Sequence, residues 1–398
     1  MTARPRVLFV TYEASRTGSP LLLLRLLRWL HEAGTLDLEV VCWRGGPLVG
    51  DFAALADTRS LAPPGRRTTI EALAVGAGEL GLGPLGRRIE ALRVARALRG
   101  RPDPDLVYLN GVPSFVAVPH LEIGPGVPVL GHVHELEFAL ARSLPAGDEA
   151  LLQRPDRFIA VSSAVAENLV ARHGIDPSDL AVCHGFVDGG APIVRRDAGR
   201  LRAQVGIPEG APVVGAMGDL IWRKGPDLFV QMAAAMARGG SGGDPPVHFV
   251  WVGGQAGRAR WDEVRYDIEA VGLAHRVHLV GEQPHPDDWH ALFDVFALTS
   301  REDPFPLVVL EAARAGVPVV SFDQGGVPEF LAPADGHAPA GTLVPPLDAG
   351  AMAAAVAGLL ADAAGRHEMG RQGRERVARR HVTAVAAPCL LAEMQALL

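Results

Sequence analysis

The sequence predicts an α/β protein built from two doubly wound domains, and three observations support this prediction. Short runs of β-branched and other apolar residues alternate with helical stretches along the chain of 398 residues. These runs are mostly continuous rather than alternating in polarity, as expected for parallel strands that are buried on both faces. The alternation occurs once in each half, and the length favours two to three domains rather than one.

The expected strands are apolar runs bounded by turn residues. In the first half they are Arg6–Tyr12, Asp37–Trp43, Leu106–Gly111, Val127–Glu135, Arg157–Ser163 and Leu180–Phe186. In the second half they are Pro212–Gly218, Val247–Gly254, Arg276–Glu282, Asp294–Ser300, Pro318–Asp323 and Gly341–Pro345. The stretch Gly189–Gly199 is rich in Gly and charge, so it is the natural linker between domains at residues 1–190 and 191–375.

Charge and cysteine content narrow the class of protein. The net charge of −7 argues against general nucleic-acid binding, which favours a basic surface. Cys42, Cys183 and Cys389 are odd in number, far apart and set among apolar residues. This pattern predicts buried thiols in a reducing compartment rather than a disulfide framework.

The N-terminal region predicts a cytoplasmic protein. The apolar run Val7–Tyr12 is too short for the core of a signal peptide. A second apolar run, Leu21–Leu30, is interrupted by Arg25 and Arg28 well short of the length that spans a membrane.

The most informative segment is residues 299–331, which predicts a strand end, an acidic loop, a helix and another strand. Asp303 and Glu311 are eight positions apart, so one carboxylate lies on the loop and the other inside the helix. Pro306 suits the first helical position, and Gly316 suits the position just past the helix end. Free amides at the helix N-terminus bind anions, and carboxylates accept hydrogen bonds from hydroxyls. Phosphate together with many hydroxyls describes a nucleotide sugar.

This segment resembles the E-x7-E region of family 4 of the retaining glycosyltransferases. The resemblance implies the GT-B fold, in which two doubly wound, Rossmann-like domains face each other across a cleft, and a C-terminal helix, here 376–398, packs back on the N-terminal domain. It also implies that Asp303 contacts the donor sugar and Glu311 the nucleotide ribose. The chain departs from the family pattern twice, with Asp rather than Glu at 303 and Pro306 where Gly is usual.

A basic pair follows the first strand of the second domain. In the family such a pair neutralises the donor diphosphate, so we predict this role for Arg223 and Lys224, which can form charge-assisted hydrogen bonds. Lys224 is the single lysine of the chain, and the Arg expected directly after Gly218 is replaced by Asp219. The alternative is a pair of surface cations at the start of a helix, a position that the helix dipole disfavours.

Two histidines end the fourth strand of the first domain. Alternation along a strand sends His132 and His134 to the same face, so zinc binding is conceivable, although the sequence offers no third ligand nearby. A buried structural histidine is a further alternative. The resemblance instead aligns His134 with a family histidine that points at the donor sugar.

Three other motifs indicate a function less specifically. Gly18, in the loop Tyr12–Pro20, allows close approach of a ligand to the backbone ahead of a helix. The run His285–His290 resembles a metal cluster but more plausibly opens a surface helix. The arginine-rich stretch Arg87–Arg101 could dock on an anionic membrane from the cytoplasmic side, although arginines that cover their own domain are the favoured alternative.

Together with these residues, the resemblance implies a metal-independent glycosyltransferase that moves a sugar from a nucleoside-diphosphate sugar to an acceptor hydroxyl with retention of configuration. Its acceptor would be a saccharide, a lipid-linked molecule or a small molecule, and no cofactor is expected. A non-catalytic nucleotide-sugar-binding protein, an epimerase and a phosphorylase remain alternatives. The predicted catalytic residues are His134, Asp303, Arg223 and Lys224. The predicted donor-binding residues are Gly18, Gly218, Arg223, Lys224, Asp303, Phe305, Leu307, Val308 and Glu311.

Overall fold

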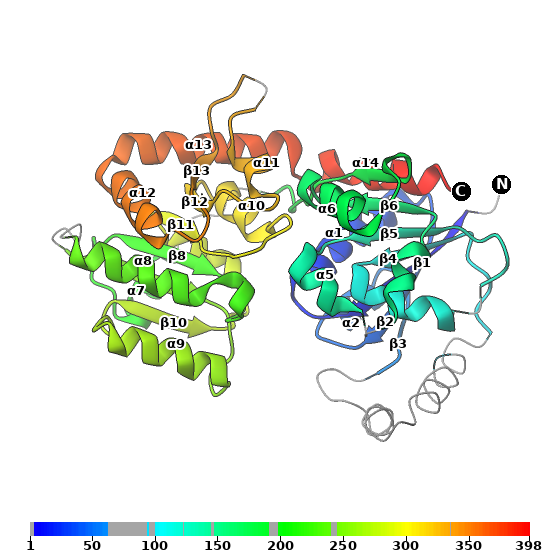
Figure 1. Ribbon diagram of the computed structural model, residues 1–398, viewed down its shortest axis with the longest axis horizontal. Coiled ribbons are helices and arrows are strands. Elements are labelled where there is room, and N and C mark those ends of the chain that lie inside the picture. The colour runs from blue at the N-terminus through cyan, green and yellow to red at the C-terminus, as the bar shows by residue number, and fades with distance from the viewer. Residues whose placement is uncertain are drawn as a thin grey trace. The chain divides into compact units, whose positions relative to one another are not determined.

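The chain folds into two compact units (Figure 1). The computed structural model describes residues 4–62, 94, 100–121, 123–144, 147–190, 198–239, 245–334 and 336–398. Unit 1 comprises Met1–Gly185 and Ala386–Leu398, and unit 2 comprises Phe186–Val385. The chain therefore passes from unit 1 to unit 2 and returns. Most of the predicted linker, residues 191–197, lies outside the described residues.

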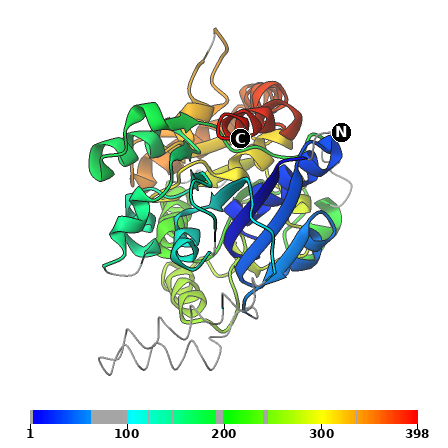
Figure 2. The ribbon, with the colours of Figure 1, turned by 90° about the vertical axis from the view of Figure 1, so that its right-hand side faces the viewer.

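Unit 1 is built on a parallel sheet of seven strands in the order β3-β2-β1-β4-β5-β6-β7. Figure 2 shows its first strands, β1 and β2, side by side in blue. The strands are β1 Arg6–Glu13, β2 Asp37–Arg44, β3 Asp57–Ser60, β4 Leu106–Asn110, β5 Val129–Val133, β6 Arg157–Ala160 and β7 Leu180–Val182. Six of them confirm the predicted strands. The seventh, β3, was not predicted because its residues, DTRS, form a polar and partly exposed edge strand.

Unit 2 is built on a parallel sheet of six strands in the order β10-β9-β8-β11-β12-β13. The strands are β8 Val213–Met217, β9 His248–Val252, β10 Val277–Gly281, β11 Val295–Leu298, β12 Val319–Phe322 and β13 Gly341–Val344. All six confirm the predicted strands. Two doubly wound parallel sheets are the predicted fold class.

Helices connect the strands in both units. The described helices of unit 1 are α1 Gly18–Ala33, η1 Val112–His120, α5 Glu137–Ser143, η2 Glu149–Gln153, α6 Ser163–His173, η3 Pro177–Asp179 and the short α2 Val49–Ala53. Those of unit 2 are α7 Ala198–Val205, η5 Trp222–Lys224, α8 Pro226–Arg238, α9 Ala259–Ala270, η6 Pro286–Ala291, α10 Leu307–Arg314, α11 Val327–Leu331, α12 Ala349–Ala361 and α13 Ala363–Arg380. The last helix, α14 Thr383–Gln395, begins in unit 2 and ends in unit 1. None of the described helices has the length and apolar character needed to cross a bilayer.

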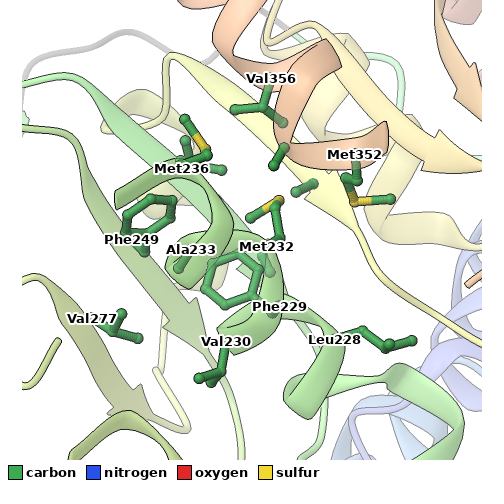
Figure 3. Close-up of a cluster of buried hydrophobic side chains, with 14 of the residues drawn as sticks. Leu228, Phe229, Val230, Met232, Ala233, Met236, Phe249, Val277, Met352 and Val356 are labelled. Carbon is green, nitrogen blue, oxygen red and sulfur yellow. The ribbon is translucent and has the colours of Figure 1, made fainter. Parts of the chain in front are cut away.

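The core of unit 2 holds α8 against the sheet (Figure 3). Phe229 and Met232 of α8 are buried with Phe249 of β9 and with Met352 and Val356 of α12. The apolar residues of α8 recur at helical spacing, so one face of the helix is buried while polar residues occupy the other. This packing fixes the N-terminal end of α8, which follows the predicted basic pair directly.

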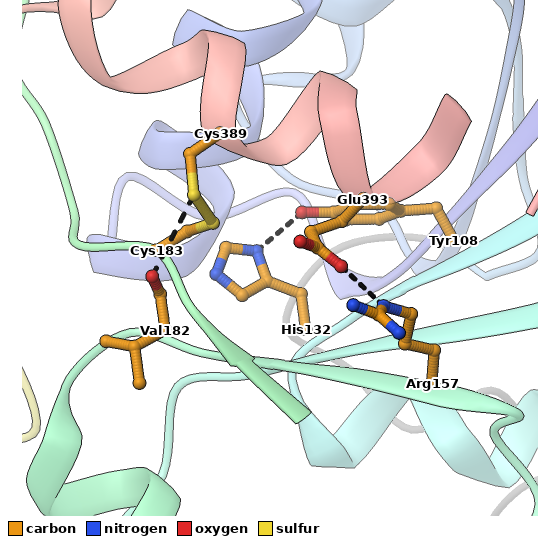
Figure 4. Close-up of a disulfide and its surroundings, with 7 residues drawn as sticks. All are labelled: Tyr108, His132, Arg157, Val182, Cys183, Cys389 and Glu393. Atoms are coloured by element: carbon orange, nitrogen blue, oxygen red, sulfur yellow. Dashed lines mark hydrogen bonds and ion pairs between the residues drawn. A yellow bond between two sulfur atoms is a disulfide. The ribbon is translucent and has the colours of Figure 1, made fainter. Parts of the chain in front are cut away.

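The prediction of free thiols at all three cysteines was wrong. Cys183 and Cys389 form a disulfide with their Cα atoms 6.0 Å apart (Figure 4). The third cysteine, Cys42, is free and buried. The two cysteines are 206 residues apart in sequence and meet because α14 returns to unit 1. Arg157 of β6 and Glu393 of α14 form an ion pair in the same region. The C-terminal helix is therefore attached to unit 1 by a covalent bond and by charge.

One other expectation needs correction. Pro306 is the residue before α10 rather than its first residue, with an extended backbone (φ −72°, ψ 116°). The run His285–His290 does begin a helix at Pro286, which is exposed, while Trp289 and His290 at the other end of η6 are buried.

Most of the arginine-rich stretch Arg87–Arg101 lies outside the described residues. Its last residue, Arg101, is described. The Arg101 side chain is 3% exposed and lies 3.6 Å from the carboxylate of Glu39. This arginine thus covers its own unit, as the alternative interpretation expects.

Candidate functional site

The strand order reverses direction once in each sheet, between β1 and β4 in unit 1 and between β8 and β11 in unit 2. Loops that follow such a pair of parallel strands diverge, and ligands of doubly wound sheets bind at this point beyond the carboxyl ends. The predicted site residues follow β8 and β11 in one unit and β1, β4 and β5 in the other.

The turn after β8 packs directly on the end of β11. Gly225 has a φ of +66°, and a Cβ atom there would lie 2.1 Å from the carbonyl oxygen of Thr299. Only glycine fits this approach. The carbonyl of Arg223 accepts a hydrogen bond from the amide of Arg301 at 2.7 Å, so the two loops are joined through their backbones.

This packing brings the predicted basic pair to the predicted acid. Lys224 Nζ lies 2.7 Å from Asp303 Oδ2, and Arg223 Nη1 lies 3.7 Å from Asp303 Oδ1. Ser300 donates a hydrogen bond to Asp303 at 2.9 Å, and the guanidinium of Arg223 donates to the carbonyl of Glu302 at 3.0 Å. Three residues from two distant parts of the sequence therefore form one charged cluster.

The electrostatics of the cluster keep Asp303 ionised. Burial raises the pKa of its carboxyl, but the charges of Lys224 and Arg223 and the hydrogen bonds outweigh burial, so the pKa of Asp303 is lowered overall. Burial also lowers the pKa of Lys224, an effect that Asp303 opposes. With two cations and one carboxylate in close contact, the cluster has a net positive charge that a phosphate group can complement.

The helix α10 lies next to this cluster in sequence and carries the second predicted acid. Glu311 is 8% exposed. The amides of Leu307 and Val308 open the helix, and the first amides of a helix have no acceptor within it. The side chain of Phe305 is buried, and its ring centre lies 5.4 Å from that of His381. Phe305 can therefore contribute to a ligand site through its backbone rather than through its ring.

The loop after β12 also contacts the cluster. The amide of Gly326 donates to the carbonyl of Asp303 at 3.1 Å, and the side chain of Gln324 donates to the carbonyl of Ser300. Gly218, the first residue after β8, lies beside the methylene groups of Lys224, with 3.5 Å between the Lys224 side chain and a Cβ placed on Gly218. Gly218 thus contacts the side chain of Lys224, whose ammonium group contacts Asp303.

In unit 1 a neutral network joins the ends of β4 and β5 to α1. Asn110, the last residue of β4, donates from its amide nitrogen to the carbonyl of Ser19 at 3.3 Å. Its amide oxygen lies 3.1 Å from His134 Nε2. Since an amide oxygen only accepts, Nε2 of His134 carries the proton, and Nδ1 is left as an acceptor. Gly18 starts α1, and no protein atom lies within 4 Å of a Cβ built there.

His132 and His134 lie on the same face, as predicted, with ring centres 4.0 Å apart. Burial lowers the pKa of His134 to about 3. Burial and the neighbouring His134 lower the pKa of His132 as well, and Tyr108 Oη lies 2.5 Å from His132 Nδ1. Both rings are therefore neutral near pH 7. In the described part of the chain these histidines belong to no group of three metal-ligand side chains; the group found is Asp287, His290 and Glu311.

Several residues of these networks were not predicted from the sequence. Asn110 could have been predicted as a site residue, because it is a polar residue at the end of the largely apolar strand β4. Ser300 could have been predicted too, since it stands three positions before Asp303 at the end of β11. His290 belongs to the run that resembles a metal cluster in the sequence, but Glu311, which lies beside it in the structure, is remote from that run in the sequence.

Family models match both units. The model described as "Glycosyltransferase Family 4" matches residues 16–189, and the model described as "Glycosyl transferases group 1" matches residues 197–376. The chain belongs to this group 1/family 4 of the glycosyltransferases.

Individual relatives agree with this assignment. The chain is 28% identical over 249 residues to "D-inositol 3-phosphate glycosyltransferase 1" of Catenulispora acidiphila, covering 58% of this chain and 59% of that protein. It is 30% identical over 217 residues to the D-inositol 3-phosphate glycosyltransferase of Mycolicibacterium gilvum, covering 51% and 47%. The chain thus spans about half the length of these curated relatives.

Among solved structures, HepE from Anabaena in complex with UDP and glucose matches with a TM-score of 0.74. The match has 19% sequence identity and covers 98% of this chain and 99% of HepE. At this identity the likeness establishes the fold, which is GT-B.

Proposed function

We propose that this protein is a retaining glycosyltransferase that binds its nucleoside-diphosphate sugar through unit 2. The observation that carries the proposal is the cluster of Arg223, Lys224 and Asp303, held by Ser300 at the point where the sheet order reverses. A buried cluster with one cation in excess suits a diphosphate, and an ionised carboxylate suits sugar hydroxyls.

In the proposed reaction, the cations of Arg223 and Lys224 bind the diphosphate and stabilise the charge that develops on it as the bond to the sugar breaks. Asp303 accepts hydrogen bonds from sugar hydroxyls, and Glu311 accepts them from the ribose. The acceptor oxygen forms the new bond to the anomeric carbon on the same face, and its proton passes to the departing phosphate oxygen. No metal is required, because cationic side chains and the amides that open α10 supply the positive charge.

The neutral His134 of unit 1 completes the proposed set of functional side chains. Its Nδ1 lone pair can accept a hydrogen bond from a hydroxyl while Nε2 donates to Asn110. The acceptor is a saccharide, a lipid-linked molecule or a small molecule. HepE, which shares the fold, was solved in complex with UDP and glucose, and this makes UDP-glucose the first donor to test.

A thermal-shift screen with UDP-, GDP-, ADP- and dTDP-sugars tests the proposal, with Glu311→Ala as the control variant. We expect one donor class to raise the melting temperature, and the rise to be lost in the variant. No shift with any donor at millimolar concentration would contradict the proposed donor site.

The alternatives differ in what they do with a bound donor. A non-catalytic binding protein shows the thermal shift but no turnover, and an epimerase changes the sugar without an acceptor. A phosphorylase needs a lysine that carries a cofactor in the second domain. The single lysine, Lys224, is instead held by Asp303 at 2.7 Å, which disfavours this alternative.

A further inference from the structure

Three consecutive carbonyl groups of η5, those of Trp222, Arg223 and Lys224, accept hydrogen bonds from the loop that follows β11. The hydroxyl of Thr299 donates to the carbonyl of Lys224 at 3.2 Å. The amide of Arg301 donates to the carbonyl of Arg223 at 2.7 Å, and its guanidinium donates to the carbonyl of Trp222 at 2.9 Å. The last carbonyls of a helix have no donor within it, so the β11 loop supplies partners that a turn of three residues cannot supply for all of them.

The side chain of Arg301 also binds the first turn of α8. Its Nη1 and Nη2 donate to Oδ1 and Oδ2 of Asp227 at 2.9 and 2.5 Å, so the guanidinium and the carboxylate form a bidentate pair. Such pairs are stronger than single contacts, and they fix the relative orientation of the two groups. Because Arg301 binds Trp222, Arg223 and Asp227, its contacts extend from the start of η5 to the first turn of α8.

The pair of Arg301 and Asp227 is mostly shielded from water, with side-chain exposures of 15% and 24%. The indole ring of Trp222 lies over the guanidinium, with 5.0 Å between the ring centre and the guanidinium carbon of Arg301. Burial raises the pKa of Asp227, but the hydrogen bonds and charge of Arg301, together with the charge of Arg260, outweigh burial, so this pKa is lowered overall. The pair is therefore ionised near pH 7 and is less screened than an exposed ion pair.

The two segments that Arg301 joins carry the three charged residues of the proposed donor site. Asp303 stands two positions after Arg301 on the β11 loop, and Arg223 and Lys224 belong to η5. The direction in which each cation points therefore depends on how η5 is held against this loop. A displacement of about 1 Å in such a group can greatly weaken its action on a ligand.

We propose that Arg301 is a positioning residue for the diphosphate site: it holds η5 and the start of α8 against the β11 loop, and so orients the side chains of Arg223 and Lys224. This inference rests on the proposed function, in which these two cations bind the diphosphate of the donor. Arg301 itself does not contact the donor, because its guanidinium is bound by Asp227 and by the carbonyl of Trp222. It acts by ordering the two cations before the ligand binds, which lowers the cost of binding.

The test compares diphosphate recognition in the wild type, Arg301→Gln and Arg260→Gln by calorimetric titration. UDP, GDP, ADP and dTDP are each compared with the monophosphate of the same base. Arg260→Gln is the matched control, because Arg260 also pairs with Asp227, at 3.3 Å, while its other ion pair is with Glu263 of its own helix. We expect Arg301→Gln to lose about tenfold in preference for the diphosphate, with monophosphate affinity nearly unchanged, and Arg260→Gln to keep the preference.

Three further variants separate positioning from loss of fold and from loss of charge. Asp227→Asn keeps Arg301 but weakens the bidentate pair, so the preference should fall in the same direction by a smaller factor. Arg301→Lys keeps the charge but cannot bind a carbonyl and both carboxylate oxygens together, so it should restore little of the preference. In the Lys224→Gln background, Arg301→Gln should have a smaller effect than in the wild type, because one of the cations that it positions is absent.

Each outcome decides one question. If the wild type binds no nucleoside diphosphate, the proposed function fails and this inference fails with it. If the wild type prefers the diphosphate and Arg301→Gln prefers it equally, only the inference is overturned. An equal loss in Arg260→Gln, or full preference in Arg301→Lys, would also overturn it, because charge alone would then explain the result.

Full preference in Asp227→Asn together with a loss in Arg301→Gln would overturn the inference as well, since Arg301 would then act on the ligand directly. If the melting temperature shows that Arg301→Gln does not fold, Arg301→Lys and Asp227→Asn decide the question by the same comparison.

Discussion

The two units present contrasting polar networks beyond their sheets. In unit 2 the network is ionic, because Lys224 and Arg223 surround an Asp303 whose pKa is lowered. In unit 1 the pair of side chains Asn110 and His134 is neutral, because burial lowers the pKa of His134 to about 3, and the nearby carboxylate of Glu135 accepts hydrogen bonds from backbone amides. Both networks occur where the strand order reverses, so one architecture carries two different chemistries.

This difference indicates that the two networks suit different chemical groups. A charged cluster suits a ligand that is itself charged, whereas a neutral imidazole and an amide suit hydroxyl groups. The contrast extends to covalent structure, since all three cysteines belong to unit 1 and unit 2 has none. Substitutions in each network test whether this difference matters for binding, catalysis and stability.

The largest effect is expected from Lys224→Gln. Loss of this cation removes the partner of Asp303 and a ligand of the proposed diphosphate, so kcat/KM should fall by about 100-fold or more. Steady-state kinetics with the donor identified in the screen measure this. Arg265→Gln is the matched control, because Arg265 makes exposed ion pairs with Asp262 and Glu269. Equal activity of the two variants would show that the ionic network of unit 2 is not needed for activity.

The disulfide should stabilise unit 1 specifically. Reduction, or Cys389→Ser, should lower the free energy of unfolding by about 2–4 kcal/mol, because Cys183 and Cys389 close a very long loop. Hydrogen exchange followed by mass spectrometry should show faster exchange in unit 1 peptides, including those of α14. A reductant should have no effect on Cys389→Ser, and unchanged exchange in the reduced wild type would contradict the prediction.

Asn110→Ala should lower the activity without changing the net charge of the protein. The variant removes the hydrogen bond that orients His134, so kcat/KM should fall by about tenfold. The loss should be the same at low and high salt, whereas binding that depends on Lys224 should weaken as salt increases. A salt-dependent loss in Asn110→Ala would show that the unit 1 network is not neutral in function.

Acidification should reduce the stability contributed by His134 and by Asp303 over different pH ranges. The pKa of His134 is about 3 in the folded protein and about 6.5 when unfolded, so the unfolded state binds more protons between these values. The stability that the neutral His134 contributes to the folded state is fully present above about pH 6.5. It is lost as the pH falls, by up to about 1 kcal/mol per pH unit. Asp303 contributes instead above its unfolded pKa of about 3.9 and loses stability only below it.

Melting temperatures between pH 7 and pH 5 measure this effect. His134→Gln should have a smaller decrease than the wild type over this range, and Asp303→Asn should leave the decrease unchanged. An identical pH dependence of all three proteins would contradict the assignment to His134.

Much of the fold was predictable because parallel strands leave a local signature. Val7–Val10 of β1 and the whole of β8 are continuous apolar runs, and every strand of unit 2 was placed from a run of mainly apolar residues. The strand β3 could not, because an edge strand with polar residues lacks the pattern. The boundaries of α10 were predicted to within one residue, since a proline precedes the helix and Gly316 follows it.

The long-range contacts were beyond local reasoning. The Cys183–Cys389 bond depends on the return of α14 to unit 1, which no residue near either cysteine reveals. The burial of His290 depends on how η6 packs, although its sequence resembles that of a surface helix. By contrast, the contact of Lys224 with Asp303 agrees with the prediction that they share a site, because the ends of adjacent parallel strands meet.

Calorimetric titration of the wild type and Lys224→Gln with nucleoside diphosphates and monophosphates measures diphosphate recognition by the cluster itself. UDP, GDP, ADP and dTDP are each compared with the monophosphate of the same base. We predict that one diphosphate binds the wild type at least about tenfold more tightly than its monophosphate, and that Lys224→Gln loses this preference. Equal affinity for diphosphate and monophosphate in the wild type, or an unchanged preference in the variant, would contradict this prediction.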